Sequence, residues 1–222
     1  MTQKIVIIGC GWLGKQLASK LFAENFQVFG TRQSAEGLAE LPAGVQPLLL
    51  KLPLDFADAA LLEAFRESWL ICAIPPSARQ QSAEQYAQQL QSLVALAQQA
   101  GSRGMIHCSS TGVYQGLSGD VDEQSILSDH PRVRQLSAAE HILQQLPHCV
   151  TIRLAGLIGP GRNPARFGQG RTLSGPELPV NLVHVIDICR FVLTLLRHRP
   201  KKCVPERRAA LTLCEHRSGA GC

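Results

Sequence analysis

The stretch that decides the fold reads Lys4-Ile5-Val6-Ile7-Ile8-Gly9-Cys10-Gly11-Trp12-Leu13-Gly14. Its apolar run is typical of a buried strand, and a helical pattern follows from Lys15 to Ala23. In a G-x-G-x-x-G turn between strand and helix, Gly9 permits the sharp exit from the strand. Gly11 lets the backbone approach a pyrophosphate, and Gly14 lets the helix pack closely on the sheet. The helix N-terminus then presents unpaired N–H groups to the phosphates, so the sequence predicts a dinucleotide-binding site.

The residues after the second predicted strand indicate which dinucleotide is preferred. An NAD site usually has an Asp or Glu about 20 residues beyond the first glycine, where it binds the ribose 2′-hydroxyl. This chain has Thr31, Arg32, Gln33 and Ser34 there instead, and a guanidinium suits a 2′-phosphate better than a hydroxyl. We therefore predict NADP as the cofactor, with NAD possible, although Arg32 could also be a solvated loop residue. The predicted cofactor-binding residues come from the turn, from this segment and from the loop after the fourth strand: Gly9, Gly11, Trp12, Leu13, Gly14, Thr31, Arg32, Ile74 and Pro75.

Strands and helices alternate along most of the chain. Strands are predicted at Lys4–Ile8, Gln27–Arg32, Val45–Leu52, Trp69–Ile74, Met105–Cys108 and Val150–Leu154. Helices are predicted at Lys15–Ala23, Ala57–Arg66, Arg79–Ala100, Val133–Leu146 and Ile186–Arg197. This order predicts an α/β fold with a doubly wound parallel sheet of the Rossmann type and a ligand cleft at the carboxyl ends of the strands. We expect residues 1–199 to form one NAD(P)-binding domain with part of a substrate region, and residues 200–222 to form an irregular basic tail that contains cysteines.

The charge distribution argues against a nucleic-acid partner. The formal net charge is +5, but residues 197–222 carry the whole excess, with seven Lys or Arg against two Asp or Glu. The rest of the chain therefore lacks the basic surplus that phosphate-backbone binding requires. No apolar run approaches the roughly 20 residues of a spanning helix. The N-terminal residues show no signal-peptide pattern, so we expect no membrane partner and a cytoplasmic protein.

The cysteines give no sign of a disulfide framework or a metal site. Five of the eight lie in apolar segments, where we expect reduced, buried thiols: Cys10, Cys72, Cys108, Cys149 and Cys189. The spacing of the remaining candidate ligands matches no usual zinc finger, so we predict no metal: Cys203, Cys214, His216 and Cys222.

Three motifs carry a resemblance to a known family. Ser109–Tyr114 reads S-S-T-G-V-Y, Arg153–Gly161 reads R-L-A-G-L-I-G-P-G, and Val180–Asp187 reads V-N-L-V-H-V-I-D. They resemble the motifs of extended short-chain dehydrogenases, the NAD-dependent epimerase/dehydratase superfamily. In particular they resemble its YeeZ-like branch, which shares the glycine spacing and the R-L-A-G-L-x-G-P-G-R stretch. The resemblance covers the chain from Lys4 to about Leu196.

The resemblance implies part of a catalytic site. In the superfamily a Ser or Thr binds the substrate oxygen, a role that falls on Ser110, with Thr111 as a close alternative. A Tyr-x-x-x-Lys pair does the acid–base work, but the alignment puts Arg132 at the tyrosine position and Leu136 at the lysine position. An arginine stays protonated and a leucine has no proton to give, so neither can do that chemistry.

Other residues could take the acid–base role of the missing Tyr-x-x-x-Lys pair. Tyr114, His130 and His141 are candidate bases, although each has a plain structural role as an alternative. The family element at His184 and Asp187 shapes the substrate side, while Asp187 could simply lie in the first turn of a helix. Polar or anionic substrate groups could be held by three further residues: Arg153, Arg162 and Asn181.

Two functions of different class follow. The protein is either an oxidoreductase or epimerase acting on a nucleotide-sugar-like or small carbonyl substrate, or a non-catalytic NADP(H)-binding or redox-sensing module. A homodimer is possible through Arg79–Ala100 and Val133–Leu146, because the stripe at Tyr86, Leu90, Leu93 and Val94 is strongly apolar, although it could equally pack on its own sheet. The irregular tail predicts an incomplete or truncated C-terminal substrate lobe and an open cleft, unless it is a divergent terminus.

Overall fold

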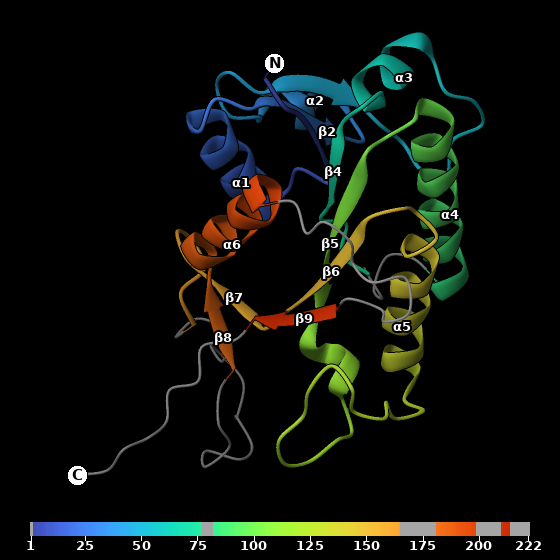
Figure 1. The fold of residues 1–222 in the computed structure, drawn as a ribbon, viewed down its shortest axis with the longest axis vertical. Coiled ribbons are helices and arrows are strands. Elements are labelled where there is room, and N and C mark those ends of the chain that lie inside the picture. The colour runs from blue at the N-terminus through green and yellow to red at the C-terminus, as the bar shows by residue number, and fades with distance from the viewer. Residues whose placement is uncertain (1, 77–81, 165–180, 199–209, 214–222) are drawn as a thin grey trace.

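The computed structural model describes residues 2–76, 82–164, 181–198 and 210–213. Its centre is a parallel sheet in the order β3-β2-β1-β4-β5-β6-β9 (Figure 1). The strands are β1 (Lys4–Ile8), β2 (Gln27–Arg32), β3 (Gln46–Leu49), β4 (Trp69–Cys72), β5 (Gly104–Ser110), β6 (Cys149–Leu154) and β9 (Ala210–Leu213). This is the predicted doubly wound sheet. The strand order reverses between β1 and β4, and α/β proteins of this type bind ligands at such a switch point.

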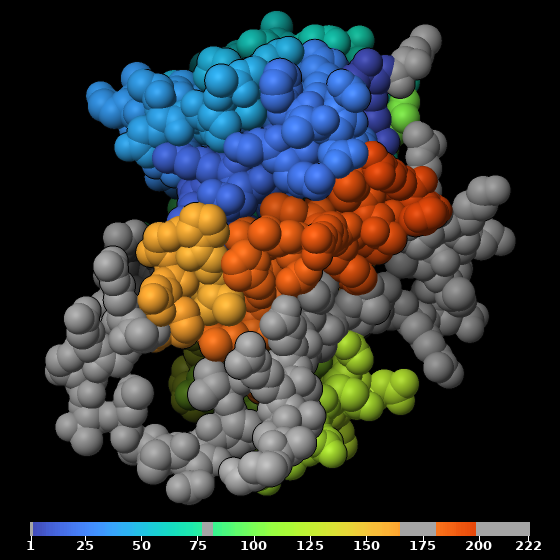
Figure 2. Space-filling model, turned by 90° about the vertical axis from the view of Figure 1, so that its left-hand side faces the viewer, coloured from blue at the N-terminus to red at the C-terminus, as the bar shows by residue number. Residues whose placement is uncertain are grey.

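Helices cover both faces of the sheet, as the figure shows (Figure 1). On one face lie α1 (Trp12–Ala23) and α6 (Val185–His198), and on the other lie α3 (Ala59–Phe65), α4 (Ala83–Ala100) and α5 (Pro131–Leu143). Alternation along β1 supplies both cores: Ile5 and Ile7 pack toward α1 and α6, while Val6 and Ile8 pack toward α3 and α4. Figure 2 shows the first face, where the orange-red α6 lies directly against the blue N-terminal part of the chain.

The helix boundaries follow the capping residues more closely than the apolar pattern. In α4, the Ser82 hydroxyl accepts a hydrogen bond from Gln85 N–H, and the Ser82 N–H donates one to Gln85 Oε1, which makes a capping box. The helix therefore starts at Ala83, whereas the sequence predicted a start at Arg79, which lies outside the described residues. Pro131 similarly starts α5 two residues before the predicted Val133.

The structure contains elements that the sequence did not predict. These are the short helix α2 (Ala35–Ala39), the 3₁₀ helix η1 (Thr111–Tyr114) and a two-stranded parallel sheet of β7 (Gly156–Ile158) and β8 (Leu182–His184). Each has five residues or fewer, so none gives a hydrophobic period long enough to detect.

The prediction that the tail is irregular throughout is wrong for residues 210–213. These form β9, which pairs with β6 in parallel, Ile152 opposite Leu211 and Leu154 opposite Leu213. The pairing satisfies backbone groups of β6 that would otherwise form an open sheet edge, a long-range effect that four residues of sequence do not reveal. The other residues beyond 198 lie outside the described part of the chain.

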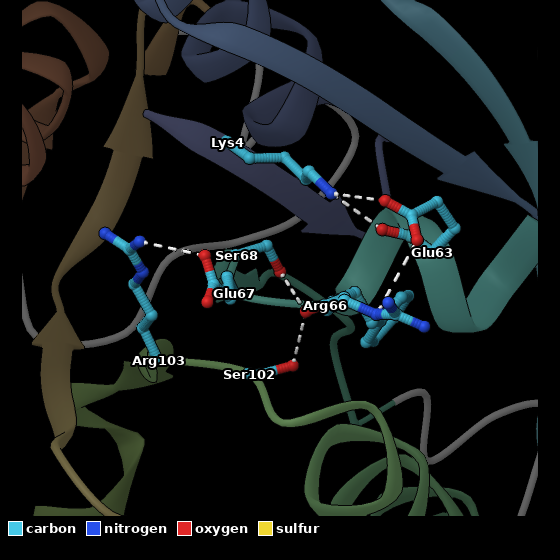
Figure 3. A network of polar contacts seen from close by, with 8 residues as sticks. Lys4, Glu63, Arg66, Glu67, Ser68, Ser102 and Arg103 are labelled. Atoms are coloured by element: carbon cyan, nitrogen blue, oxygen red, sulfur yellow. Dashed lines mark hydrogen bonds and ion pairs between the residues drawn. The ribbon is translucent and has the colours of Figure 1, made fainter. Parts of the chain in front are cut away.

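The amino ends of the strands are closed by a polar network (Figure 3). Lys4 Nζ donates to the main-chain oxygen of Glu63 at 2.7 Å, and the Ser68 and Ser102 hydroxyls donate to that of Phe65 at 2.8 and 2.9 Å. The two serines satisfy a carbonyl at the C-terminal end of α3 that has no helical partner. This end of the sheet is thus built for stability, and the candidate site lies at the opposite end.

The apolar stripe on α4 is buried within the chain itself. Tyr86, Leu90, Leu93 and Val94 are all at most 5% exposed and pack on the sheet. The stripe therefore gives no support to the predicted dimer. Among the helices that the structure describes, none is both long and apolar enough to cross a membrane.

Candidate active site

The glycine turn has the geometry of a phosphate cradle. Gly9 has a φ of +83°, and a Cβ there would lie 3.1 Å from Ile74 N, so both conformation and space require glycine. A Cβ on Gly14 would lie 2.8 Å from Gly9 O. At Gly11, in contrast, a Cβ would be in ordinary van der Waals contact with Arg32 NH1 at 3.8 Å, so the protein leaves room for a small group in the space in front of this residue.

The N-terminus of α1 behind this space has no local counter-charge. Gly11 is its N-cap, no side chain caps the helix, and the first turn contains no acidic residue. The positive end of the helix dipole and its free N–H groups therefore face a ligand site. This arrangement fits the pyrophosphate of a dinucleotide.

A cavity of about 940 Å³ lies at the carboxyl ends of the strands. Ser110 lines this cavity. So do eight of the nine predicted cofactor residues: Gly9, Gly11, Trp12, Leu13, Thr31, Arg32, Ile74 and Pro75. Gly14 does not, because it lies behind the turn against Gly9. The structure thus brings the turn, the end of β2, the loop after β4 and the end of β5 to one space.

Thr31 and Arg32 at the end of β2 have different tasks. Thr31 is 2% exposed, and its hydroxyl accepts a hydrogen bond from Gly9 N–H at 3.1 Å, so it holds the turn in place. Arg32 NH1 donates to Cys10 O at 3.3 Å, and NH2 lies 3.7 Å from Glu40 Oε2. The guanidinium therefore borders the turn, and within the described part of the chain its one carboxylate contact, the long one to Glu40, opposes binding of a further anion.

The charged side chains on the cavity wall are all cations: Arg32, Lys51, Arg132 and Arg162. No Asp or Glu belongs to the described lining. Arg162 stacks over Trp12, 4.9 Å from the ring centre, and Trp12 Nε1 donates to Pro160 O at 2.8 Å. The segment after β7 therefore closes on the glycine turn, and the cavity as a whole favours an anionic ligand.

Ser110 and Thr111 separate clearly in the structure. Ser110 Oγ lines the cavity and accepts from Gly112 N–H at 3.1 Å, and no described residue accepts the hydroxyl's own proton. Thr111 Oγ1 donates to Leu154 O at 3.4 Å and is not part of the lining. Ser110 is thus the hydroxyl that is available to a ligand.

Tyr114 lies behind the wall in a buried polar network. Its hydroxyl accepts from Arg153 NH1 at 2.9 Å, and it is 7% exposed and not part of the cavity lining. Arg153 also binds the Glu140 carboxylate, which accepts from Ser109 Oγ at 2.7 Å. The network joins β5, β6, η1 and α5, so Tyr114 and Arg153 support the site from behind rather than facing a ligand.

Arg132 and Leu136 do line the cavity, next to Ser110. A Cβ on Gly112 would lie 3.0 Å from Arg132 Nε, 3.3 Å from a Leu136 methyl and 3.3 Å from Ser110 Oγ. The three side chains therefore surround the same glycine. The groups that the family resemblance placed at the tyrosine and lysine positions are at the site, and neither can move a proton at neutral pH.

His107 was not predicted and is the most unusual residue of the wall. It lies on β5, lines the cavity, is 2% exposed, and its Nδ1 atom has no partner among the described residues. Burial lowers the pKa of His107 to about 4, an effect that the Glu140 carboxylate only partly offsets, so the imidazole is neutral at pH 7. A histidine inside the apolar run Met105–Cys108 was the signal that could have found it.

The remaining candidates have structural roles or lie away from the cavity. His130 Nδ1 accepts from Arg132 N–H and caps α5, and His184 Nδ1 accepts from Ile186 N–H. Asp187 lies in the first turn of α6 and pairs with Arg190. Two further candidates are exposed and do not belong to the described lining: His141 and Asn181.

No disulfide joins the cysteines of the described residues: Cys10, Cys72, Cys108, Cys149 and Cys189. Cys10, Cys72 and Cys189 are buried as predicted, whereas Cys108 and Cys149 are only half-buried. Burial raises the pKa of Cys108, on the cavity wall, to about 12, so it is not a nucleophile at neutral pH. The described residues contain no group of three or more side chains that could hold a metal ion. The possible zinc ligands of the tail lie outside them.

Known proteins resemble this chain over most of its length. The protein YeeZ of Escherichia coli strain K12 is 36% identical over 207 residues, which span 90% of this chain and 74% of that protein. No family model matches the sequence.

Solved structures agree with this likeness. A structure described as that of a putative NAD-dependent epimerase/dehydratase from Methylobacillus flagellatus has a TM-score of 0.77 and 28% identity, covering 97% of this chain and 77% of the other. UDP-glucuronic acid 4-epimerase from Bacillus cereus, in complex with UDP-glucuronic acid and NAD, has a TM-score of 0.73. It is 18% identical, with coverage of 96% and 78%, and shows a shared fold. The chain therefore belongs to the extended short-chain dehydrogenase superfamily of NAD-dependent epimerases and dehydratases, in its YeeZ-like branch.

Proposed function

We propose that this protein binds NADP(H) in the cavity, with NAD(H) as a weaker ligand, and acts as an oxidoreductase or epimerase. The observation that carries the proposal is that Gly11, at the uncapped N-terminus of α1, lines the same cavity as Ser110. Solved relatives of the same fold contain NAD, which supports a nicotinamide dinucleotide here.

The preference for NADP rests on the end of β2. The ribose of a dinucleotide bound across the switch point lies next to this strand end. Arg32 borders the cavity there, with Ser34 and Lys51 also on the wall. A guanidinium gives a 2′-phosphate charge-assisted hydrogen bonds that a 2′-hydroxyl does not receive.

Ser110 is the residue proposed to act on the substrate. A bound nicotinamide would supply hydride transfer, and Ser110 would donate a hydrogen bond to the oxygen on the substrate carbon that is oxidised or reduced. We propose a nucleotide-sugar-like or small carbonyl substrate, since a structural neighbour is a UDP-glucuronic acid epimerase.

A second candidate function is a binding module that responds to the redox state of its cofactor without turnover. It is favoured by Arg132 and Leu136 beside Ser110. The cavity wall also lacks an available phenol: Tyr86 is its one tyrosine among the described residues, and the Tyr86 hydroxyl donates to Ile74 O at 3.0 Å. Burial raises the pKa of Tyr86 well above its ordinary value, which keeps its proton in place.

One experiment separates these functions. Nicotinamide absorbance is followed while the protein and NADPH or NADP⁺ are offered a panel of carbonyl compounds and sugar nucleotides. The enzyme proposal predicts turnover with at least one substrate, and Ser110→Ala lowers kcat about 100-fold or more while cofactor affinity is unchanged. Thr111→Ala is the matched control, because its hydroxyl lies outside the cavity lining. Tight NADPH binding without turnover across the panel would favour the module.

Two further expectations complete the proposal. We expect a cytoplasmic location, because the five cysteines of the described residues form no disulfide. We also propose a homodimer through α4 and α5, which the family resemblance alone supports. Light scattering at micromolar concentration tests it, and a monomer mass would contradict it.

A further inference from the structure

Arg132 differs from Arg134 and Arg153 in that none of the residues described by the structure gives it an anionic partner. Arg134, two residues further along α5, contacts both Asp129 oxygens at 3.0 and 3.2 Å. Arg153 is held by Glu140 at 2.8 Å. For Arg132, no carboxylate among the described residues lies within ion-pair distance, although its side chain lines the cavity. A guanidinium presents five donors in a fork that matches an oxyanion, so this one is available to a ligand.

Two other side chains of the same wall have hydrogen-bonding capacity that no described residue uses. The Ser110 hydroxyl shares the Gly112 neighbourhood with Arg132 and keeps a free proton. The His107 side chain is almost completely buried, yet its Nδ1 atom has no hydrogen-bond partner among the described residues. The Nδ1 atom itself is closed off from the cavity, so the ligand contacts proposed below go to Ser110 and Arg132.

The subsite is distinct from the proposed cofactor phosphate sites. Arg32 lies at the end of β2, whereas Ser110 ends β5 and Arg132 lies in the first turn of α5. In the sheet order, β1 and β4 separate β2 from β5. A dinucleotide with its ribose at β2 and its pyrophosphate at Gly11 thus places its nicotinamide toward Ser110, so Arg132 faces what binds beside the nicotinamide.

We propose that Arg132 and Ser110 form an anion subsite, and that the second ligand of the cavity carries a carboxylate or phosphate group bound there. The Arg132 guanidinium takes two oxygens of the anion, and Ser110 donates to the anion or to the adjacent carbonyl oxygen. Because no acidic residue belongs to the described lining, nothing on that wall repels such a ligand. This inference rests on the proposed function and names the substrate class for the same cavity: small oxo acids or phosphorylated carbonyl compounds rather than neutral ones.

The test measures anion binding directly, without turnover. Wild-type protein saturated with NADPH is titrated calorimetrically with oxalate, with inorganic phosphate and with oxamide, the neutral counterpart of oxalate. We expect oxalate or phosphate to bind and oxamide not to bind. Arg132→Gln should weaken anion binding at least about tenfold, because charge-assisted hydrogen bonds are lost. Arg134→Gln, on the same helix but paired with Asp129, should change it less than about twofold.

The outcomes separate this inference from the proposed function. Equal anion affinity in wild type and Arg132→Gln, or no binding of either anion, would overturn the subsite. NADPH affinity of Arg132→Gln within about twofold of wild type shows that the variant is folded and that Arg132 is not a cofactor ligand. If NADPH does not bind the wild type, the proposed function fails, and the same titration of the free protein still decides the subsite.

Discussion

Arg153 on β6 and Glu140 on α5 form a buried, two-point ion pair. Arg153 Nε donates to Glu140 Oε1 at 3.1 Å and NH2 donates to Oε2 at 2.8 Å, with both side chains less than 10% exposed. Burial would lower the pKa of Arg153, but hydrogen bonds to Glu140 and Tyr114 outweigh it and raise that pKa. The pair fixes α5, and therefore Arg132, against the end of the sheet.

The first prediction concerns this pair. Glu140→Gln should lower the free energy of unfolding by roughly 3–5 kcal/mol, because it leaves the Arg153 charge buried and unpaired. The double variant Glu140→Gln with Arg153→Met should recover part of the loss, since no buried charge remains. Urea unfolding measures both. Asp129→Asn breaks the exposed pair with Arg134 and should cost less than about 1 kcal/mol. Equal costs for the two single variants would contradict the reasoning.

A second prediction contrasts two glycines of the turn. Gly11→Ala should leave unfolding free energy within about 1 kcal/mol of wild type, because its Cβ meets no protein atom closer than 3.8 Å. It should weaken NADPH binding at least about tenfold by placing a methyl group where the pyrophosphate approaches. Gly14→Ala should mainly destabilise the fold, since its Cβ would lie 2.8 Å from Gly9 O. Fluorescence titration and urea unfolding separate the two effects, and unchanged binding in Gly11→Ala would disprove the cradle.

Cofactor preference is the third prediction. Arg32→Ala should weaken NADP(H) binding by about 2–4 kcal/mol and NAD(H) binding by much less, because the lost hydrogen bonds go to the 2′-phosphate. Glu40→Gln should act in the opposite direction and tighten NADP(H), because its carboxylate lies 3.7 Å from Arg32. Arg103→Ala, at the other end of the sheet and paired with Glu67, is the control. Calorimetric titration of both cofactors decides, and equal losses for the two would refute the assignment.

The pH dependence of stability follows from His107. Its pKa is lowered from 6.5 to about 4 in the folded protein, so the unfolded chain binds more protons between these values. The neutral His107 therefore contributes up to roughly 3 kcal/mol to the free energy of unfolding above pH 6.5, and this contribution is lost as the pH falls toward 4. His107→Phe should remove this part of the decline, whereas His141→Phe on the exposed face should not. Urea unfolding at pH 7 and pH 4.5 tests it, and parallel declines in all three proteins would rule it out.

Much of the fold could be read from local patterns. The glycine turn, the buried strands and α4 have periods long enough to identify, and the alternation of strands and helices implied the parallel sheet. The boundaries of α4 and α5 could not be read from the apolar period, because Ser82 and Pro131 set them. β9 depended on an unpaired edge of β6, which lies more than 50 residues away in the chain.

The site was predictable only where a motif marks one local element. Ser110 and the turn residues line the cavity as expected, but Thr111 and Tyr114 do not, although they belong to the same motif. The turn of η1 directs Ser110 to the cavity and Tyr114 to Arg153 on the neighbouring strand. That turn and the strand beside it decide which polar residue of the motif, Ser110, Thr111 or Tyr114, faces a ligand.

By itself, the sequence determined the strand-to-helix glycine turn, the fold class and the presence of Thr31 and Arg32 in place of an acid at the end of β2, because each depends on residues close together in the chain. Only the tertiary structure decided which cations share one cavity, that His107 lies on its wall, and that Glu140 holds Arg153 while Arg132 remains available. These relations join residues on different strands and helices, and such contacts exist only after the crossovers have brought the carboxyl ends of the strands together.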